Sequence, residues 1–244
     1  LPGELGFYDL RVAETRTAQA ELARAHGIDA FCYYHYWFEG RRLLERPFEE
    51  VRATGVPDLP FCLCWANESW TRAWSDREGQ ILIEQRYSES DDLAHARYLA
   101  DTFADPRYLR VDGRPLLLVY RAAALPDPRR TSAHIRREAL RRGVGDPLLC
   151  RVESDPWLER RLAPAEIGFD AAVEFSPDWL DLDPVRGARH RTTPTGDRIY
   201  DYAGVVERSL ARAEPAYPTF RCLTPGWDNA PRRRNDCVVW RRAV

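Results

Sequence analysis

Two kinds of hydrophobic pattern alternate along the chain. Segments with apolar residues three and four positions apart predict amphipathic helices, and short apolar runs rich in β-branched and aromatic residues predict buried strands. The predicted helices cover residues 13–26, 47–55, 90–105, 131–143 and 201–213. The predicted strands lie within residues 28–37, 60–68, 115–120, 148–154, 169–176 and 219–225.

The order of these elements predicts the fold class. Strand, helix and strand follow one another repeatedly, which indicates right-handed crossovers and a parallel sheet. No G-x-G-x-x-G or P-loop motif follows the first predicted strand, so an open nucleotide-binding sheet is disfavoured. Polar and aromatic residues instead end nearly every predicted strand, where a (β/α)8 barrel has its active site. We therefore predict an α/β fold of the (β/α)8 TIM-barrel type.

The predicted barrel is incomplete in this chain. About six strands are predicted, whereas a complete barrel has eight, so strands are expected to be missing. No internal repeat or low-complexity linker divides the sequence, and residues 178–199, with Gly187, Pro194 and Gly196, predict a long loop. Residues 1–244 are therefore predicted to form a single domain. The chain contains no methionine, and we interpret it as a piece of a longer protein.

The composition disfavours several classes of partner. The formal net charge is -2, so neither nucleic acid nor an anionic membrane surface is an expected partner. No apolar run reaches the roughly 18 residues of a membrane span, and the N-terminus lacks the pattern of a signal peptide. The six cysteines include no C-x-x-C pair and the five histidines no H-E-x-x-H motif, so no metal or cofactor is predicted. A cytoplasmic location is the default expectation.

Residues able to carry chemistry gather at the ends of the predicted strands. In the first strand, His35 and Trp37 share one face while Tyr34 and Tyr36 share the other. A strand of a parallel sheet is buried on both faces, so charged side chains there must be paired, hydrogen-bonded or placed at the open mouth. No G-x-S-x-G elbow is present to support a serine nucleophile, which leaves carboxylate acid/base chemistry as the predicted mechanism.

Aromatic rings beside carboxylates and amides are typical of a carbohydrate pocket. The C–H faces of sugar rings stack on tryptophan and tyrosine, and sugar hydroxyls need donors and acceptors such as Asn, Asp, Glu and Arg. Residues 65–74, which read WANESWTRAW, supply both kinds of group within ten positions. Three tryptophans at a strand end and in its following loop are difficult to explain by core packing alone.

Several candidates also have a purely structural interpretation. His35, taken alone, is more often a hydrogen-bonded core histidine than a catalyst, and its aromatic neighbours make the two interpretations about equal. Glu68 fits a loop-anchoring ion pair equally well. Glu153 fits an internal salt bridge with Arg151, since alternation places both on one face of their strand.

Five segments of the chain resemble one known family. In order, they read GIDAFCYYHYWFEGRRLLERPFEE, PFCLCWANESWTRAW, DGRPLLLVYR, GFDAAVEFSP and PGWDNAPRR. They are similar to the WbsX-like family, whose members are described both as glycosyltransferase WbsX and as glycoside hydrolase family 99-like proteins. The resemblance covers essentially the whole chain, and WANE-x-WTR-x-W and PGWDN-x-PR are specific. It implies a (β/α)8 barrel that acts on glycans, commonly in bacterial surface-polysaccharide loci.

One departure from the family pattern concerns catalysis. Proteins of this family normally begin with a strand that reads like Y-x-P-Q-F-H. They end with an N-E-W-x-E-G motif whose two glutamates look like an acid/base pair. Neither motif occurs between Leu1 and Val244. The resemblance therefore implies that the first and last strands are missing and that the catalytic pair lies beyond Val244. The chain alone is expected to be inactive.

The resemblance and the strand-end positions together suggest roles, which we state as hypotheses. Catalytic candidates within the chain, which would bind hydroxyls or tune a neighbouring pKa, are Glu68, Glu153, Glu174 and Asp228. The residues predicted to bind a glycan are Tyr34, His35, Tyr36, Trp37, Trp65, Asn67, Trp70, Arg72, Trp74, Arg151, Trp227, Asn229 and Arg232.

The predicted activity is that of a glycoside hydrolase or transglycosidase acting on polysaccharide. A nucleotide-sugar glycosyltransferase is the first alternative. It would need a diphosphate site such as D-x-D, and Asp181 with Asp183 in the predicted loop is interpreted as a chance match. A non-catalytic glycan-binding barrel is the second alternative. A glycan is the expected partner in all three cases.

Overall fold

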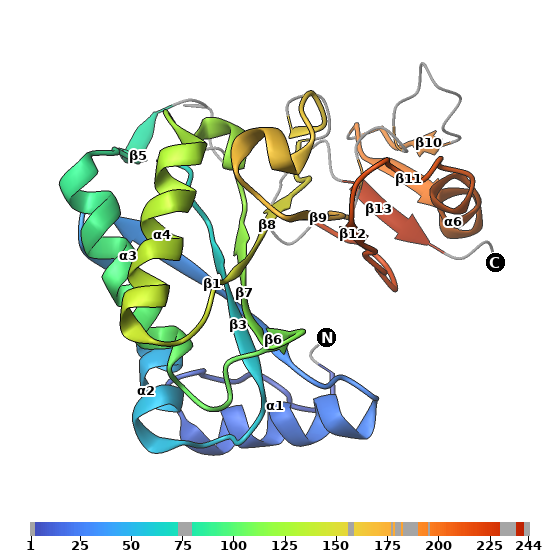
Figure 1. Cartoon of the computed structure of the whole chain (residues 1–244). Helices are drawn as coiled ribbons and strands as arrows, with labels where there is room; N and C mark the ends of the chain where they lie inside the picture. The colour runs from blue at the N-terminus through green and yellow to red at the C-terminus, as the bar shows by residue number, and fades with distance from the viewer. Residues whose placement is uncertain are drawn as a thin grey trace.

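The computed structural model describes residues 3–72, 80–155, 159–176, 178, 182, 190–194, 196–229 and 238–241. A mostly parallel sheet carries helices α3 (Glu89–Phe103) and α4 (Pro128–Arg142) on one face (Figure 1). A smaller sheet with helix α6 (Tyr202–Leu210) lies beside it. Trp74 and Arg232, both predicted to bind a glycan, lie outside the described residues.

Six parallel strands form the main sheet, and each matches one of the predicted apolar runs. They are β1 (Phe31–Phe38), β3 (Phe61–Trp65), β7 (Arg114–Val119), β8 (Leu148–Val152), β9 (Ala171–Val173) and β12 (Thr219–Phe220). Each pairs in parallel with the next, so their order in the sheet is their order along the chain. A doubly wound sheet reverses its strand order at a switch point. The described parallel strands show no such reversal.

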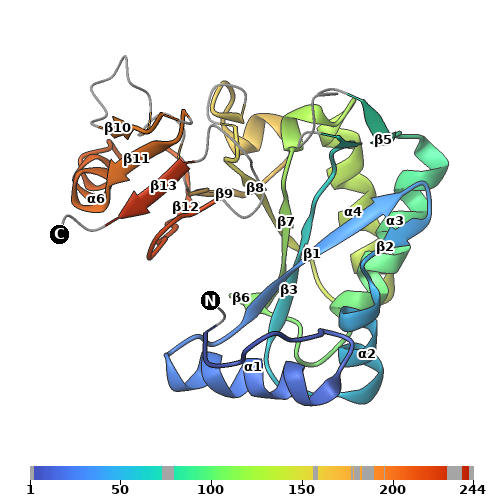
Figure 2. The ribbon, with the colours of Figure 1, turned by 180° about the vertical axis from the view of Figure 1, so that it is seen from behind.

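The sheet is open among the described residues. One edge is β12 and the other is β2 (Arg41–Leu43), which pairs antiparallel with the C-terminal part of β1. No described strand joins these two edges, so the described residues form an open sheet and not a closed barrel. Figure 2 shows β1 and β2 nearest to the viewer, with α1 (Ala13–Ala25) below them.

Helix boundaries follow local capping signals. Helices α2 (Arg46–Thr54) and α4 end at Gly55 and Gly143, whose φ angles of 74° and 78° are typical of C-terminal caps. Helix α3 begins after Ser88, whose hydroxyl accepts a first-turn N–H, and so starts before the predicted Ser90. Helix α4 begins after Asp127, which caps it in the same way, and so starts before the predicted residue 131.

Short strands and turns complete the fold. Strands β4 (Trp70–Thr71) and β5 (Ile81–Ile83) form a two-stranded sheet, and β6 (Arg110–Val111) pairs with β7. The second sheet contains β10 (His190–Thr192), β11 (Arg198–Asp201) and β13 (Val238–Arg241). Because β10 and the start of β11 fall within residues 178–199, the described part of this predicted loop is not irregular throughout. Two 3-10 helices, η1 (Ala122–Ala124) and η2 (Pro164–Ile167), follow β7 and β8.

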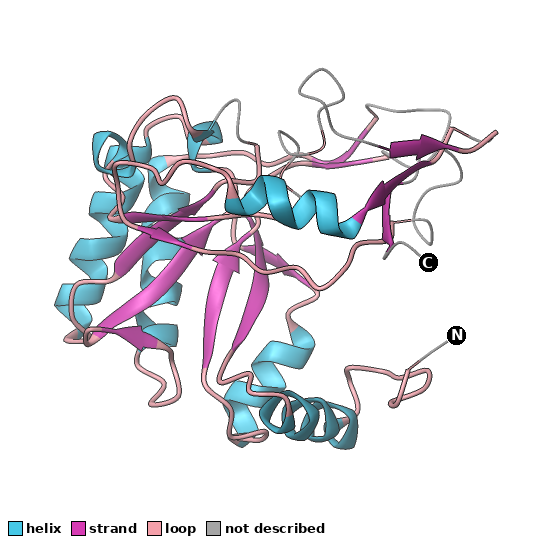
Figure 3. Ribbon diagram, turned by 90° about the vertical axis from the view of Figure 1, so that its right-hand side faces the viewer, coloured by secondary structure: helices cyan, strands magenta, loops and turns pink. Residues whose placement is uncertain are grey.

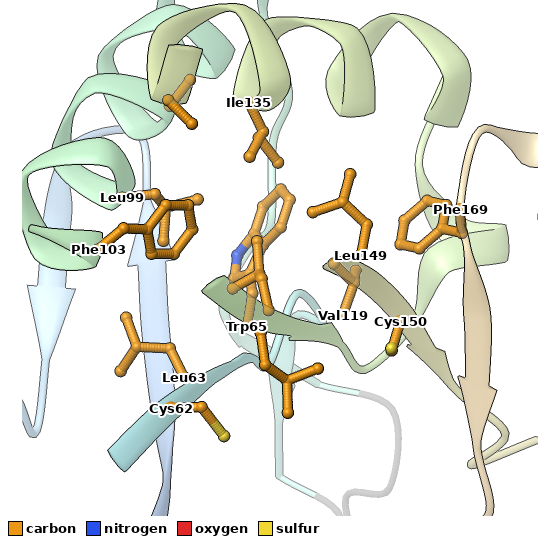
Figure 4. Close-up of a cluster of buried hydrophobic side chains, with 14 of the residues drawn as sticks. Cys62, Leu63, Trp65, Leu99, Phe103, Val119, Ile135, Leu149, Cys150 and Phe169 are labelled. Atoms are coloured by element: carbon orange, nitrogen blue, oxygen red, sulfur yellow. The ribbon is translucent and has the colours of Figure 1, made fainter. Parts of the chain in front are cut away.

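The main hydrophobic core lies between the sheet and helices α3 and α4. Figure 4 shows Trp65 and Leu149 reaching from the strands towards Ile135 of α4, while Cys62 and Cys150 point to the opposite side. Every residue of β3 is buried, so this strand is packed on both faces. Figure 3 shows the strands fanned beside these helices, with α1 at the lower end of the sheet.

Candidate functional site

Strand β1 divides its side chains between the two faces of the sheet, and His35 and Trp37 lie on the face covered by α3. The Nε2 atoms of His35 and His95 are 3.0 Å apart, and Trp37 Nε1 donates to Asp91 Oδ1 at 2.9 Å. Burial lowers the pKa of His35 to about 3 and also lowers that of His95, so both rings are neutral. This placement argues against the prediction that His35 and Trp37 bind a glycan; both are part of the core.

Trp65 and Asn67 are also structural residues. Trp65 is 1% exposed, and its ring packs 4.4 Å from the ring of His95. The Asn67 side chain donates to Tyr87 Oη and to the Arg121 carbonyl, and accepts from the Arg121 N–H at 2.8 Å. Since these bonds tie the end of β3 to the end of β7, the amide of Asn67 is used within the protein. These contacts argue against the glycan-binding role predicted for Trp65 and Asn67.

Tyr34 and Tyr36 lie on the opposite face of β1 and take part in a continuous row of aromatic rings. We call Trp70, Tyr36, Tyr34, Tyr120 and Phe175 the aromatic row. Successive ring centroids along it are 5.3, 6.3, 6.0 and 5.6 Å apart. Tyr34 is 51% exposed, so the row presents ring surface to solvent. Three of its members were predicted to bind a glycan.

Tyr120 and Phe175 were not among the predicted binding residues. Tyr120 directly follows β7, and Phe175 comes two residues after β9. Both therefore extend from the C-terminal end of a parallel strand, which was the signal that could have identified them. Burial raises the pKa of Tyr34 and of Tyr120, so both hydroxyls stay protonated and can donate hydrogen bonds.

A cluster of charged side chains lies beside the aromatic row. Arg121 Nε is 2.9 Å from Glu68 Oε2, and Arg121 Nη1 is 3.5 Å from Asp155 Oδ2. The guanidinium carbon lies 5.4 Å from the centre of the Tyr120 ring. We call Glu68, Arg121 and Asp155 the mouth cluster. Its members follow β3, β7 and β8, and the carboxylates remain partly exposed to solvent.

Glu153 and Arg151 form a buried network, as the structural interpretation of these residues expects. Glu153 accepts hydrogen bonds from Arg151, Arg160 and the Tyr217 hydroxyl, the last at 2.6 Å. Burial opposes ionisation of Glu153, but the hydrogen bonds from Tyr217 and Arg160 outweigh it and hold the pKa below its ordinary value. Both residues are at most 3% exposed, so they do not reach a ligand at the surface.

The remaining predicted acids and Asn229 also have partners within the protein. Glu174 accepts from Arg221 at 2.7 Å and from the Cys222 N–H at 3.1 Å. Asp228 forms an isolated β-bridge with Val239, and the Asn229 side chain accepts the N–H of Val238 at 2.7 Å.

Trp227 packs against the core of the second sheet and not against the aromatic row. Arg72 is exposed directly after β4. Of the predicted set, the structure therefore brings together Tyr34, Tyr36, Trp70 and Glu68.

A buried acid that the sequence did not single out lies next to the mouth cluster. Both carboxylate oxygens of Glu159 are 3.3 Å from the Ala123 nitrogen in η1. Burial raises the pKa of Glu159 to about 7, and the nearby charges of Arg151 and Arg121 only partly oppose this effect. No sequence pattern marks this residue, because its burial depends on η1, which lies more than thirty residues away in the chain.

Two further features concern the described part of the chain. No group of three or more His, Cys, Asp or Glu side chains there is arranged to hold a metal ion. None of the helices there has the length and apolar character needed to cross a membrane.

Comparison with known proteins identifies the family. The model of the family described as glycosyltransferase WbsX matches residues 1–244. The chain belongs to the WbsX family. Two proteins from Xanthomonas campestris pv. campestris, strains B100 and ATCC 33913, are each named "Uncharacterized protein WxcX" and are 43% identical to this chain over 235 residues. The match covers 96% of this chain and 33% of each relative, so the chain spans about a third of their length.

A solved structure shows a similar fold. It is described as "Glycoside hydrolase-like protein", and it aligns with this WbsX-family chain at a TM-score of 0.58 and 12% identity. The alignment covers 98% of this chain and 71% of the solved one. The fold of this WbsX-family chain is therefore similar to most of the fold of that longer solved protein.

Proposed function

We propose that this chain is the glycan-binding part of a carbohydrate-active enzyme that acts on glycosidic bonds. The aromatic row beside the mouth cluster is the observation that carries the proposal. Exposed tyrosine and tryptophan rings stack on the C–H faces of sugars, and carboxylates accept hydrogen bonds from sugar hydroxyls. The mouth cluster has two carboxylates and one guanidinium, a net charge of one negative, which favours a neutral or basic sugar over an acidic one.

The proposal includes a (β/α)8 barrel in the longer protein. Sequential strand order and the likeness to a larger glycoside hydrolase-like structure support this architecture. A cavity of about 720 Å³ lies at the outer edge of β1, lined in part by Leu22 of α1, Phe31 of β1 and Phe48 of α2. A further strand supplied from outside residues 1–244 would cover this apolar lining and continue the sheet.

We place the acid and base of the reaction outside residues 1–244. Glu153 and Glu174 are held in ion pairs, which leaves them poorly suited to exchange protons with a substrate. Glu68 and Asp155 are accessible and serve to bind hydroxyl groups. In hydrolysis or transglycosylation, one carboxylic acid protonates the leaving oxygen while a second group assists attack at the anomeric carbon.

Titration calorimetry with oligosaccharides prepared from bacterial surface polysaccharide tests the proposal. The variants Tyr34→Ala and Tyr120→Ala are expected to weaken binding about fivefold, since each removes a stacking ring worth roughly 1 kcal/mol. Phe7→Ala is the matched control, because Phe7 is 95% exposed and lies outside the aromatic row. Equal affinities for all three variants and the unchanged protein would contradict the proposed site.

A nucleotide-sugar glycosyltransferase is the second candidate, favoured by the name of the family. Its signature would be a diphosphate site, and the D-x-D residues Asp181 and Asp183 lie outside the described residues. Thermal-shift titration of the longer protein with nucleotide sugars, with and without Mn²⁺, separates the two candidates. A rise in melting temperature with nucleotide sugars and none with oligosaccharides would favour the transferase. A cytoplasmic location and a single domain remain predictions.

A further inference from the structure

Asn67 holds the main chain of Arg121 at the point where two parallel strands stop pairing. The register between β3 and β7 ends at Trp65 and Val119, and the Tyr120 N–H then donates to the Trp65 carbonyl at 2.9 Å. Beyond this bond, the Asn67 side-chain oxygen accepts the Arg121 N–H at 2.8 Å, and its nitrogen donates to the Arg121 carbonyl at 2.9 Å. One side chain therefore fixes both main-chain polar groups of Arg121.

The Asn67 amide is itself held in one orientation. Its nitrogen also donates to the Tyr87 hydroxyl at 3.1 Å, and that hydroxyl donates to the Asn67 carbonyl at 3.0 Å. Asn67 is 1% exposed, so water does not replace these partners, and a buried polar group without a partner is costly. The amide therefore has a single favourable arrangement, in which it binds Tyr87 and Arg121 together.

The Arg121 main chain decides where the guanidinium lies. Its φ and ψ angles of -126° and 68° belong to neither a helix nor a strand, so a regular backbone pattern does not set them. From this position the side chain reaches Glu68 at 2.9 Å and Asp155 at 3.5 Å, and it lies over the ring of Tyr120. A shift of the Arg121 main chain would therefore move the centre of the mouth cluster and release both carboxylates.

We propose that Asn67 is a positioning residue for glycan binding that acts through Arg121. This role rests on the proposed function, in which Glu68 and Asp155 bind sugar hydroxyl groups. Like charges repel, and the guanidinium between the two carboxylates holds them in place. Hydrogen bonds weaken steeply when their geometry is poor, so carboxylates in fixed places bind a given sugar better than mobile ones. Asn67 thus contributes to affinity without touching the glycan.

A double-mutant cycle measured by titration calorimetry with the same oligosaccharides tests the positioning role. Asn67→Ala is expected to weaken binding about fivefold, the effect of losing roughly one hydrogen bond at the site. Arg121→Ala should weaken binding at least as much. The double variant should bind no more weakly than Arg121→Ala alone, because Asn67 acts through that side chain. Losses that add in the double variant, or unchanged affinity in Asn67→Ala, would overturn the proposal.

Tyr108→Phe is the matched control for a lost buried hydrogen bond between the same two strands. The Tyr108 hydroxyl accepts the Leu63 N–H at 3.2 Å and donates to the Leu116 carbonyl at 2.8 Å, and Tyr108 is 2% exposed. These bonds join β3 and β7 before the strand ends that carry the mouth cluster. Tyr108→Phe is therefore expected to lower the melting temperature and to leave oligosaccharide affinity unchanged. An equal loss of affinity in Tyr108→Phe would assign the effect of Asn67→Ala to general destabilisation.

Tyr87→Phe is a milder variant that serves if Asn67→Ala does not fold. It removes the hydroxyl that orients the Asn67 amide and keeps the bonds between Asn67 and Arg121. Binding is expected to weaken about twofold, and not at all in the Arg121→Ala background. A further loss in that background would contradict a role exerted through Arg121.

A measurement without sugar separates this role from the proposed function. The ¹H–¹⁵N signal of Arg121 Nε, assigned with Arg121→Lys, reports its hydrogen bond with Glu68. It should shift in Asn67→Ala and stay in place in Tyr108→Phe. An unmoved signal in Asn67→Ala would overturn the positioning role even in a protein that binds oligosaccharides. A shifted signal in a protein that binds none would confirm the link from Asn67 to Arg121 and contradict the proposed function.

Discussion

The two faces of β1 use similar aromatic side chains in opposite ways. Towards α3, His35 and Trp37 are buried, and their ring nitrogens contact groups on that helix. On the other face, Tyr34 is half exposed and continues into a row of rings contributed by three other segments. Aromatic content alone therefore does not identify a binding surface. The two roles differ in exposure and in the contacts that α3 makes with the first face.

The largest expected difference between the faces comes from removing one tryptophan on each. Trp65→Ala should lower the free energy of unfolding by about 3–5 kcal/mol, because the ring is fully buried beneath α3 and α4. Trp70→Ala should cost about 1 kcal/mol or less, since its ring is only partly buried. Urea denaturation followed by circular dichroism measures both. Equal losses would show that the aromatic row is as much a part of the core as Trp65.

Acid should lower the stability of the protein through His35 and His95, which lie on the helix-facing side of β1. The pKa values of His35 and His95 are lowered in the fold, from an ordinary value of 6.5. Below pH 6.5 the unfolded chain therefore binds more protons than the folded one. The free energy of unfolding should fall as the pH drops from 6.5 towards 3, by about 1.4 kcal/mol per pH unit for each histidine.

Urea denaturation at pH 7.0 and pH 5.5 measures this loss, which should reach about 2–3 kcal/mol for the two histidines together. His35→Gln should reduce the loss, because it removes one of the two groups that must be protonated on unfolding. His26→Gln is the control, since His26 is exposed. The same pH dependence in both variants would mean that the histidine pair does not cause it.

Glu159 is a buried acid at the mouth of the sheet, close to the accessible acids of the mouth cluster. Burial raises its pKa from 4.5 to about 7, so the folded protein retains a proton that the unfolded chain releases. Stability should fall as the pH rises through this range and stay low above it. Glu159→Gln should therefore be about 2 kcal/mol more stable than the unchanged protein at pH 8 and no more stable at pH 4.5.

Thermal and urea unfolding at the two pH values measure the effect of Glu159→Gln. Glu21→Gln, at an exposed position on α1, isolates the general effect of removing one negative charge. A stabilisation of the same size in both variants would assign the gain to net charge and not to Glu159.

The smallest expected effect on stability belongs to the mouth cluster. Glu68→Gln weakens an ion pair with Arg121 in which the Glu68 side chain is 45% exposed, so the free energy of unfolding should change by about 1 kcal/mol or less. Oligosaccharide affinity, measured by titration calorimetry, should fall by a larger factor than stability implies. A large loss of stability with unchanged oligosaccharide affinity would instead support the structural interpretation of Glu68, in which its ion pair anchors the loop.

The parallel strands could be predicted because their signal is local. Continuous apolar runs marked all six, and glycines at 55 and 143 marked the ends of two helices. Helix starts were less accurate, because the capping residues Ser88 and Asp127 precede the apolar pattern that was used to locate the helices. Strand β10 and the start of β11, within residues 178–199, were missed because the turn residues there dominate the pattern.

The candidate site was harder to predict because it depends on contacts distant in sequence. Alternation along β1 correctly separated Tyr34 from His35, but it does not say which of the two faces is covered by a helix. The covered face is the one that carries His35, because His95 of α3, sixty positions later in the chain, packs against it. Tyr120 and Phe175 join the aromatic row only because β7 and β9 place their ends near β1, and this proximity is a property of the whole sheet.

The sequential strand order has a consequence for how the protein folds during synthesis. Each new parallel strand pairs with the parallel strand made just before it, so the chain never has to leave a gap to be filled by a later segment. Partners of short sequence separation cost less entropy to bring together, and folding rates rise as the average separation falls. The sheet can therefore grow at one edge as the ribosome releases each strand and helix, while the edge formed by β2 stays where it is.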